Sequence, residues 1–238
     1  MTYTLQGLIR RNLNNATAQF DRLGTISTNF TNINTVGFKS SSFDQLLKLD
    51  GSIETYTRRD DSKGQIRITN NDFDIAIDGS GFIPVTSETG EVAYSRDGSL
   101  KIGKDGYLLT TDGWIVGDGI KIPANYECLR IKQDGTVVMI GGEDKNEEKL
   151  GKIPLVRFEN TQGLIQGDSN KFYQTEDSGE PILIKDHESI CQGSLESSNT
   201  DINANINEVL RLNASMLASY KLVKVVDDLY QKSVNLRQ

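Results

Sequence analysis

The chain of 238 residues has few of the side chains that build metal and redox sites: two cysteines, one histidine and one tryptophan. Cys128 and Cys191 are too few for a disulfide framework, and neither belongs to a C-x-x-C pair or has histidine partners at zinc spacing. We expect both to be small buried hydrophobic residues. His187 stands alone, and a solitary histidine is more often a hydrogen-bonded or surface residue than a catalytic base.

Long hydrophobic runs are also missing. No apolar stretch approaches the roughly 20 residues needed to cross a bilayer. The first twenty residues lack the apolar core and small-residue cleavage site of a secretory signal. We therefore expect no membrane insertion, and a chain that either stays in the cytoplasm or leaves it by a route that does not cleave the N-terminus.

Nucleotide and calcium motifs are absent from the sequence as well. The glycine pairs in 79–81 and 117–119 lack a third spaced glycine, and no Gly-Lys-Ser/Thr follows them. Asp72, Asp74 and Asp78 come nearest to a calcium loop but lack its spacing and its terminal glutamate. We interpret them as strand ends and a turn. The sequence predicts no catalytic site, no cofactor and no metal, and therefore no enzyme.

Charge and turn residues are unevenly distributed. Of the net charge of −7, residues 1–49 contribute +3, residues 192–238 contribute 0, and residues 50–191 therefore contribute −10. An acidic middle repels phosphates and argues against nucleic acid as a partner. All four prolines and 18 of the 22 glycines also lie between residues 50 and 191. Composition thus divides the chain into three segments.

The central segment is β in character. Asp-Gly favours hairpin turns because both residues tolerate positive φ, and it occurs seven times here, six of them from residue 78 onward. The runs between these turns predict a hairpin-rich sandwich or barrel. Pro84 predicts an edge strand at its position, and the charged residues 141–150 predict an exposed loop. The predicted strands are 73–77, 81–86, 92–95, 99–103, 107–110, 114–116, 129–132 and 136–140.

Both ends are predicted to be helical. From residue 202 to residue 238 no Gly or Pro interrupts apolar residues spaced three and four apart, which predicts a helix of about 50 Å. A residue of 199–201 would cap it. Residues 9–30 show a similar heptad-like spacing, and Gly37 offers a left-handed stop. The seam residues expected at an assembly interface are Leu13, Phe20, Leu23, Ile206, Val209, Met216, Tyr220 and Val223.

The predicted fold class is α+β: an assembly helix and bend (1–49), a β-rich central domain (50–191), and a second assembly helix (192–238). Residues 40–49 are expected to form a short helical turn or to extend from the coil. The two helices could belong to one compact core, or they could pair as a coiled coil whose remaining faces pack against neighbouring copies. The length of the C-terminal pattern favours the coiled coil, because helices in compact domains average about a dozen residues.

The end of the first helical segment carries the string TNFTNINTVGFK over residues 28–39. Asn and Thr side chains compete for backbone hydrogen bonds and favour turns. The string resembles the N-terminal signature of bacterial flagellar axial proteins, A-N-N-x-A-N-x-x-T-x-G-F-K, with threonine at 28 and 31 where alanine is usual. We expect this bend to set how the helical arm leaves the core. The matching residues are Asn29, Asn32, Asn34, Thr35, Gly37, Phe38 and Lys39.

Two further stretches strengthen the resemblance. DIAIDGSGF (74–82) followed by AYSRDGSL (93–100) looks like the pattern of rod and hook proteins. QGSLESSNTD (192–201) looks like the stretch that launches their C-terminal helix, with Thr200 in place of the usual valine. Because the matches follow the expected order over nearly the whole chain, the sequence is identified as a member of the bacterial flagellar basal-body rod protein family, of the FlgG and FlgF kind and related to the hook protein.

The resemblance implies a structural subunit of the rod, favouring the distal rod, that polymerises through its terminal helices into a tube transmitting torque from motor to hook. It implies export by the flagellar type III apparatus without signal cleavage, a place in the periplasm-spanning rod, and partners among its own copies and other rod and hook proteins. A proximal-rod or short hook-type protein is the alternative. In a different class, the chain would be a soluble β-rich binding module on a helical stalk, which clustered aromatic residues would support; Trp114, however, stands alone.

Overall fold

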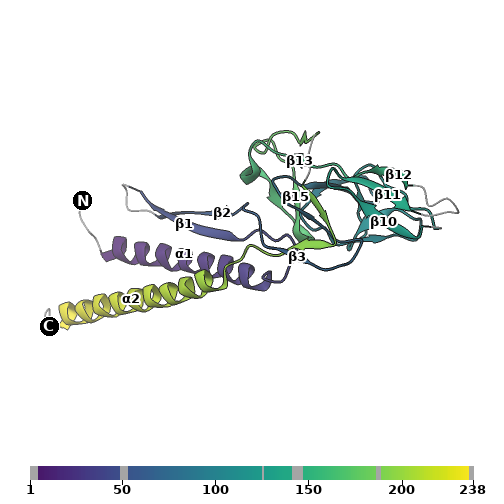
Figure 1. Cartoon of the computed structure of the whole chain (residues 1–238). Coiled ribbons are helices and arrows are strands. Elements are labelled where there is room, and N and C mark those ends of the chain that lie inside the picture. Colours follow the sequence, from purple (N-terminus) through teal and green to yellow (C-terminus); the bar gives the residue numbers. More distant parts are fainter. Residues whose placement is uncertain (1–4, 49–52, 125, 141–146, 186–188, 236–238) are drawn as a thin grey trace. The chain divides into compact units, whose positions relative to one another are not determined.

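The chain divides into two compact units in a computed structural model that describes residues 5–48, 53–124, 126–140, 147–185 and 189–235 (Figure 1). The helical unit comprises Met1–Asn32, Ser41–Asp60 and Thr200–Gln238, and the β unit comprises Ile33–Ser40 and Asp61–Asn199. The α+β class predicted from the sequence is confirmed. The chain crosses between the units more often than its composition suggests, because residues 33–40 belong to the β unit and residues 41–60 return to the helices.

The helical unit contains two long helices and one hairpin. Helix α1 spans Leu5–Thr31 and α2 spans Ile202–Asn235, and they lie side by side (Figure 1). Strands β1 (Ser41–Leu47) and β2 (Ile53–Arg59) pair antiparallel from Ser41↔Arg59 to Leu47↔Ile53 and contact α1. The helical turn predicted for residues 40–49 is therefore wrong. Cross-strand pairing with residues 53–59 gives this segment backbone partners that its own short apolar pattern does not reveal.

The start of α2 agrees with the predicted cap, whereas α1 ends before Gly37, its predicted stop. Asp201 caps α2, since its Oδ1 accepts hydrogen bonds from the backbone N–H groups of Asn203 (2.8 Å) and Ala204 (3.1 Å). Helix α1 ends at Thr31, and the turn that follows it contains Gly37 at φ 65°, a left-handed conformation that glycine adopts without strain. None of the described helices has the length and hydrophobicity to cross a membrane.

The β unit contains short, mostly antiparallel strands in several sheets. The largest sheet has seven strands in the order β14-β15-β6-β5-β9-β8-β7, and β10-β11-β12 form a second sheet. The pairs β13–β16, β17–β4 and β18–β3 are separate two-stranded ladders. Within the described ranges no sheet closes into a barrel. The strands are β3 (Ile66–Ile68), β4 (Ile75–Ile77), β5 (Ile83–Thr86), β6 (Val92–Ser95), β7 (Leu100–Ile102), β8 (Leu108–Thr110), β9 (Ile115–Val116), β10 (Cys128–Ile131), β11 (Thr136–Ile140), β12 (Glu147–Lys152), β13 (Val156–Arg157), β14 (Ile165–Gln166), β15 (Lys171–Tyr173), β16 (Ile182–Leu183), β17 (Ile190–Gln192) and β18 (Ser194–Glu196).

The eight predicted strands coincide with β4 to β11 within two residues at either end. The Asp-Gly turns explain this success. Gly106, Gly113 and Gly135 have φ of 82°, 90° and 82° and close the hairpins β7–β8, β8–β9 and β10–β11. Local turn chemistry therefore fixed where the chain reverses.

Two details of the predicted β segment are wrong. Pro84 does not lie on an edge strand, because β5 pairs with both β6 and β9. It is tolerated because β9 has two residues and pairs only with Val85 and Thr86, while the Pro84 carbonyl still accepts a bond from the N–H of Gly117 (2.9 Å). Of the predicted loop 141–150, residues 141–146 lie outside the described residues, and residues from 147 onward form β12.

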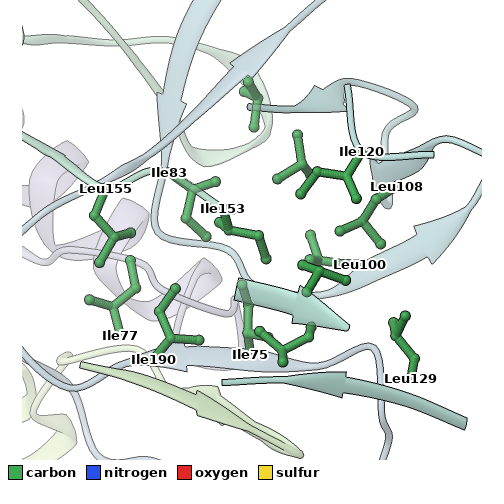
Figure 2. Packing of buried hydrophobic residues seen from close by; sticks show 14 of the residues in the cluster. Ile75, Ile77, Ile83, Leu100, Leu108, Ile120, Leu129, Ile153, Leu155 and Ile190 are labelled. Carbon is green, nitrogen blue, oxygen red and sulfur yellow. The ribbon is translucent and has the colours of Figure 1, made fainter. Parts of the chain in front are cut away.

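Aliphatic side chains fill the interior of the β unit. Figure 2 shows how they converge from strands that are far apart in the sequence, from β4 through β8 and β10 to β17. A smaller aromatic cluster contains Phe82, Tyr94, Phe158 and Phe172; the Tyr94 and Phe158 rings meet edge to face at 4.8 Å. Neither cysteine belongs to the aliphatic core or to the aromatic cluster. Both are free thiols, and Cys128 is exposed, so its predicted burial is wrong.

The aliphatic core sets the stability of the β unit. Leu108 is fully buried, whereas Leu183 is 53% exposed on β16. We expect Leu108→Ala to lower the free energy of unfolding by about 2–5 kcal/mol, because it removes buried methyl groups and leaves a cavity. The matched control Leu183→Ala should change it by less than about 1 kcal/mol. Urea unfolding followed by the fluorescence of Trp114 measures both, and equal effects would contradict the assigned core.

Candidate functional site

Polar side chains join the two long helices. Asn15 Nδ2 donates to Ser219 Oγ (3.3 Å) and Gln19 Nε2 donates to Ser215 Oγ (2.9 Å). Further along, Arg22 forms an ion pair with Glu208. Because the residue numbers rise along α1 as they fall along α2, the helices run antiparallel. Polar side chains thus form several of the contacts at this interface, where the sequence pattern predicts apolar ones.

Asn29 is the point at which three elements of the helical unit meet. Its side chain is 4% exposed. Its Nδ2 donates to the carbonyl of Ser41 (2.8 Å) and to Asn205 Oδ1 (3.2 Å), while its Oδ1 accepts the N–H of Ser41 (2.9 Å). One amide therefore ties α1 to the start of β1 and to α2. Only an asparagine or glutamine side chain presents a donor and an acceptor side by side in this way.

Very little apolar surface is buried in the helical unit. Among its described side chains, the only buried hydrophobic ones are Ala18, Ile26 and Leu212, whereas the two clusters of the β unit contain 16 and 6 buried residues. A folded core residue normally touches six to twelve others. Among the side chains that the structure describes, the helical unit has no hydrophobic core cluster of that kind.

Instead, α2 presents large apolar side chains to solvent. An exposed stripe, spaced four, four, seven and three residues apart, lies on one helix face, roughly 120° around the axis from the residues that contact α1. These residues, which we call the α2 stripe, are Ile202 (49% exposed), Ile206 (45%), Leu210 (61%), Leu217 (62%) and Tyr220 (68%).

Five of the seven predicted seam residues whose side chains are described are exposed. Ile206 and Tyr220 belong to the α2 stripe, and Val223 is also exposed. Val209 and Met216 are half-buried. On α1, Phe20 is 62% exposed and Leu23 is 41% exposed, whereas the side chain of Leu13 lies outside the described part. Their assignment to contacts with other chains stays a prediction.

The bend after α1 belongs to the β unit. Gly37 and Phe38 are buried there, while Asn34 is exposed and Asn32 bonds back to the Thr28 carbonyl of α1 (2.9 Å). A Cβ on Gly37 would lie 2.6 Å from the carbonyl oxygen of Arg96. This close approach, together with its positive φ, requires glycine at this position.

A buried triad of charged side chains lies beside this bend. Glu196 Oε1 accepts Lys39 Nζ (2.7 Å) and the N–H of Gly64 (2.8 Å), and its Oε2 accepts Arg96 Nη1 (3.1 Å). The three charged residues are 1%, 1% and 5% exposed in the order Lys39, Glu196, Arg96. Arg96 Nη2 also donates to the carbonyl of Gly79 (2.8 Å), and Lys39 to that of Ser62 (2.6 Å). Each of the three sequence motifs thus contributes one charge to a single buried site.

Burial shifts the ionisation of the two cations. It lowers the pKa of Lys39 below its ordinary value of 10.5, and although the hydrogen bond and charge of Glu196 act in the opposite direction, the charge of Arg96 reinforces the lowering. Burial likewise lowers the pKa of Arg96, against the attraction of Glu196. Lys39 and Arg96 share the one carboxylate of Glu196. The attraction of Glu196 for each cation therefore does not offset the lowering of its pKa by burial.

The sequence did not predict Lys39, Arg96 and Glu196 as site residues, although each of them lies within one of the three motifs. A signal was present: each is a charge that follows small or apolar residues in a stretch otherwise suited to burial. No cluster of three potential metal ligands occurs among the described residues. His187 lies outside them. The chemistry that the described site offers is therefore packing and ion pairing.

Known proteins are similar to this chain over most of its length. Residues 76–139 match the family described as "Flagellar hook protein FlgE/F/G D1 domain". The chain is 30% identical over 253 residues to the flagellar basal-body rod protein FlgG of Borreliella burgdorferi, with 93% of this chain and 95% of that protein covered. It is 29% identical over 243 residues to FlgG of Buchnera aphidicola subsp. Baizongia pistaciae (90% and 94% covered). It is 27% identical over 234 residues to FlgF of Buchnera aphidicola subsp. Schizaphis graminum (92% and 93% covered).

These matches are to structural proteins of the hook and rod class, not to enzymes. The match to the Borreliella protein extends over both units and all three motifs. The chain belongs to the family of flagellar basal-body rod proteins.

The lowered pKa of Lys39 gives a test of the triad. Between that lowered pKa and 10.5 the unfolded chain binds more protons than the folded chain, so the Lys39 contribution to the free energy of unfolding rises with pH in this window. Lys39→Met removes this contribution. Urea unfolding at about pH 8, 9 and 10 should therefore show wild type gaining stability relative to Lys39→Met as pH rises.

The exposed lysine variant Lys104→Met controls for the loss of one positive charge. If the stability of wild type relative to Lys39→Met instead fell as pH rises, the ion pair with Glu196 would raise the pKa of Lys39 more than burial lowers it, contrary to the stated cause.

Proposed function

We propose that this protein is a structural subunit of the bacterial flagellar basal-body rod that polymerises through its two terminal helices into a helical tube. The tube would carry torque from the motor to the hook. The observation that carries this proposal is the helical unit: three buried apolar side chains among its described residues, beside a helix that exposes five large apolar side chains in one stripe. Such a surface acquires its missing core from neighbouring copies.

The spacing at the helix contact supports a coiled-coil pairing within each subunit. Its members follow steps of four and three residues on α1 and of three and four on α2, which is the heptad rhythm of such pairs. They are Asn15, Gln19, Arg22, Ile26 and Asn29 on α1, and Asn205, Glu208, Leu212, Ser215 and Ser219 on α2. This pairing leaves the α2 stripe, Phe20 and Leu23 available for contacts between subunits.

The energetics favour assembly over a solitary chain. Fully burying one large aliphatic or aromatic side chain contributes about 1.5–3 kcal/mol. Five stripe residues on every subunit would supply a substantial driving force, against the entropy lost on association. Head-to-tail contacts whose rotation does not close a ring give an open helical tube.

The relatives guide the finer assignment. The similarities at 29–30% identity are to proteins named FlgG, and the one at 27% is to a protein named FlgF. We therefore favour the distal part of the rod. By the same kinship, the subunit would be exported through the flagellar type III apparatus without signal cleavage. It would then join copies of itself and other rod and hook proteins in the periplasm-spanning rod.

The stripe can be tested at adjacent positions of α2. Ile206→Asp places a charge inside the α2 stripe, whereas Asn207→Asp places the same charge on the neighbouring exposed residue. We expect Ile206→Asp to abolish formation of long particles, because a buried unpaired carboxylate is strongly unfavourable. Asn207→Asp should still assemble. Concentration-dependent sedimentation measures particle formation, and Trp114 fluorescence checks that the β unit stays folded.

Normal particles from Ile206→Asp would show that the stripe faces solvent in the assembly. The proposal would also fail if the wild-type chain remained a monomer at every concentration while its helices were fully formed.

A further inference from the structure

The β unit is completed by two segments that flank it in the sequence. Residues 33–40 precede it and are separated from the rest of the unit by the excursion of β1 and β2 into the helical unit. At the other end, β17 pairs with β4 and β18 pairs with β3. We call these the leading segment (33–40) and the closing segment (190–199). Neither forms a ladder with its sequence neighbours; both are held by distant parts of the unit.

The two segments are also held by each other. The N–H of Gly37 donates to the carbonyl of Glu196 (2.8 Å), and the N–H of Asn199 donates to the carbonyl of Phe38 (3.3 Å). The N–H of Ser40 donates to Asn199 Oδ1 (2.7 Å). These bonds need both segments in place at once. If either is missing, the other loses main-chain partners.

The triad extends this dependence to the middle of the chain. Lys39 comes from the leading segment, Glu196 from the closing segment, and Arg96 follows directly after β6 of the seven-stranded sheet. Removing one partner of a buried ion pair leaves an uncompensated charge in the interior, which is far more costly than never having had the pair. Arg96 in particular would keep only carbonyl partners if Glu196 were undocked.

We infer that the Lys39–Glu196–Arg96 triad is an end-to-end latch: the β unit reaches its stable fold only when the leading and closing segments are docked together, and it opens there only by unfolding as a whole. The inference concerns the folding of one chain and does not depend on rod assembly. For the export route proposed above, the inference means that the β unit cannot complete its folding until the closing segment, up to residue 199, has been exported.

Native-state hydrogen exchange of the wild-type full chain tests the latch without any substitution, at a concentration where the chain sediments as a monomer. The latch amides are Gly37, Gly64, Ser197 and Asn199, and reference core amides are Leu108, Ile122 and Ile153, all of them hydrogen-bonded. We expect both groups to exchange through the same global opening, with protection factors that agree within about tenfold. Latch amides that exchange a hundredfold or more faster than the core would overturn the inference.

A substitution then tests the triad itself. Glu196→Gln keeps the shape but removes the shared negative charge, and we expect it to raise the unfolding equilibrium constant of the whole β unit at least about a hundredfold, reported by the single tryptophan, Trp114. The exposed Glu88→Gln is the matched control and should leave this constant nearly unchanged. Complete loss of the Trp114 transition in Glu196→Gln alone also supports the latch.

The opposite result is equally clear. If Glu196→Gln frees the amides of Gly37 and Asn199 to exchange while the Trp114 transition keeps its midpoint, the two segments fray independently and there is no latch. Because both measurements use monomers, a failed latch and a failed assembly proposal remain distinguishable.

Discussion

A carboxylate buried among two cations imposes the main constraint on this structure. Glu196 cannot lie in the interior without donors around both of its oxygens. Lys39, Arg96 and the Gly64 backbone supply them. These donors come from three distant stretches of chain. Pairing the charge of Glu196 in the closing segment therefore requires the bend after α1 and the end of β6 to lie next to that segment. The tight glycine contacts follow from this convergence: at Gly64 an added Cβ would lie 2.0 Å from the carbonyl oxygen of Ser197.

The two units solve the problem of burial in opposite ways. The β unit is internally complete, with an aliphatic core, an aromatic cluster and a paired set of buried charges. The described part of the helical unit joins its elements through polar side chains but leaves large apolar side chains exposed. This division is what the proposed rod subunit requires: the β unit has its own core, whereas the exposed apolar side chains of the helical unit are available for contacts with other subunits.

The sequence predicted β4 to β11 because the limits of these strands depend on local turn chemistry, as at Gly106 and Gly135. It predicted both helices from the three- and four-residue spacing of their apolar residues, and the start of α2 from its cap residue. It did not reveal the polar contact between α1 and α2, because asparagine, glutamine and serine at helical spacing look like a solvated face until the partner helix is placed. The triad was hidden likewise: Lys39 and Glu196 lie 157 positions apart. The β1–β2 hairpin was missed because its pairing, and not its composition, makes it a strand.

The polar character of the helix contact has a mechanical consequence. Apolar contacts tolerate small shifts of one helix along the other, because they are not directional and one apolar neighbour can replace another. Hydrogen bonds such as Gln19–Ser215 and Asn29–Asn205 are directional and exist in one alignment only. Sliding α1 along α2 by a single turn, about 5.4 Å, would break all of these bonds together. These directional bonds therefore resist sliding of α1 along α2, so that a force along one helix is transmitted to the other.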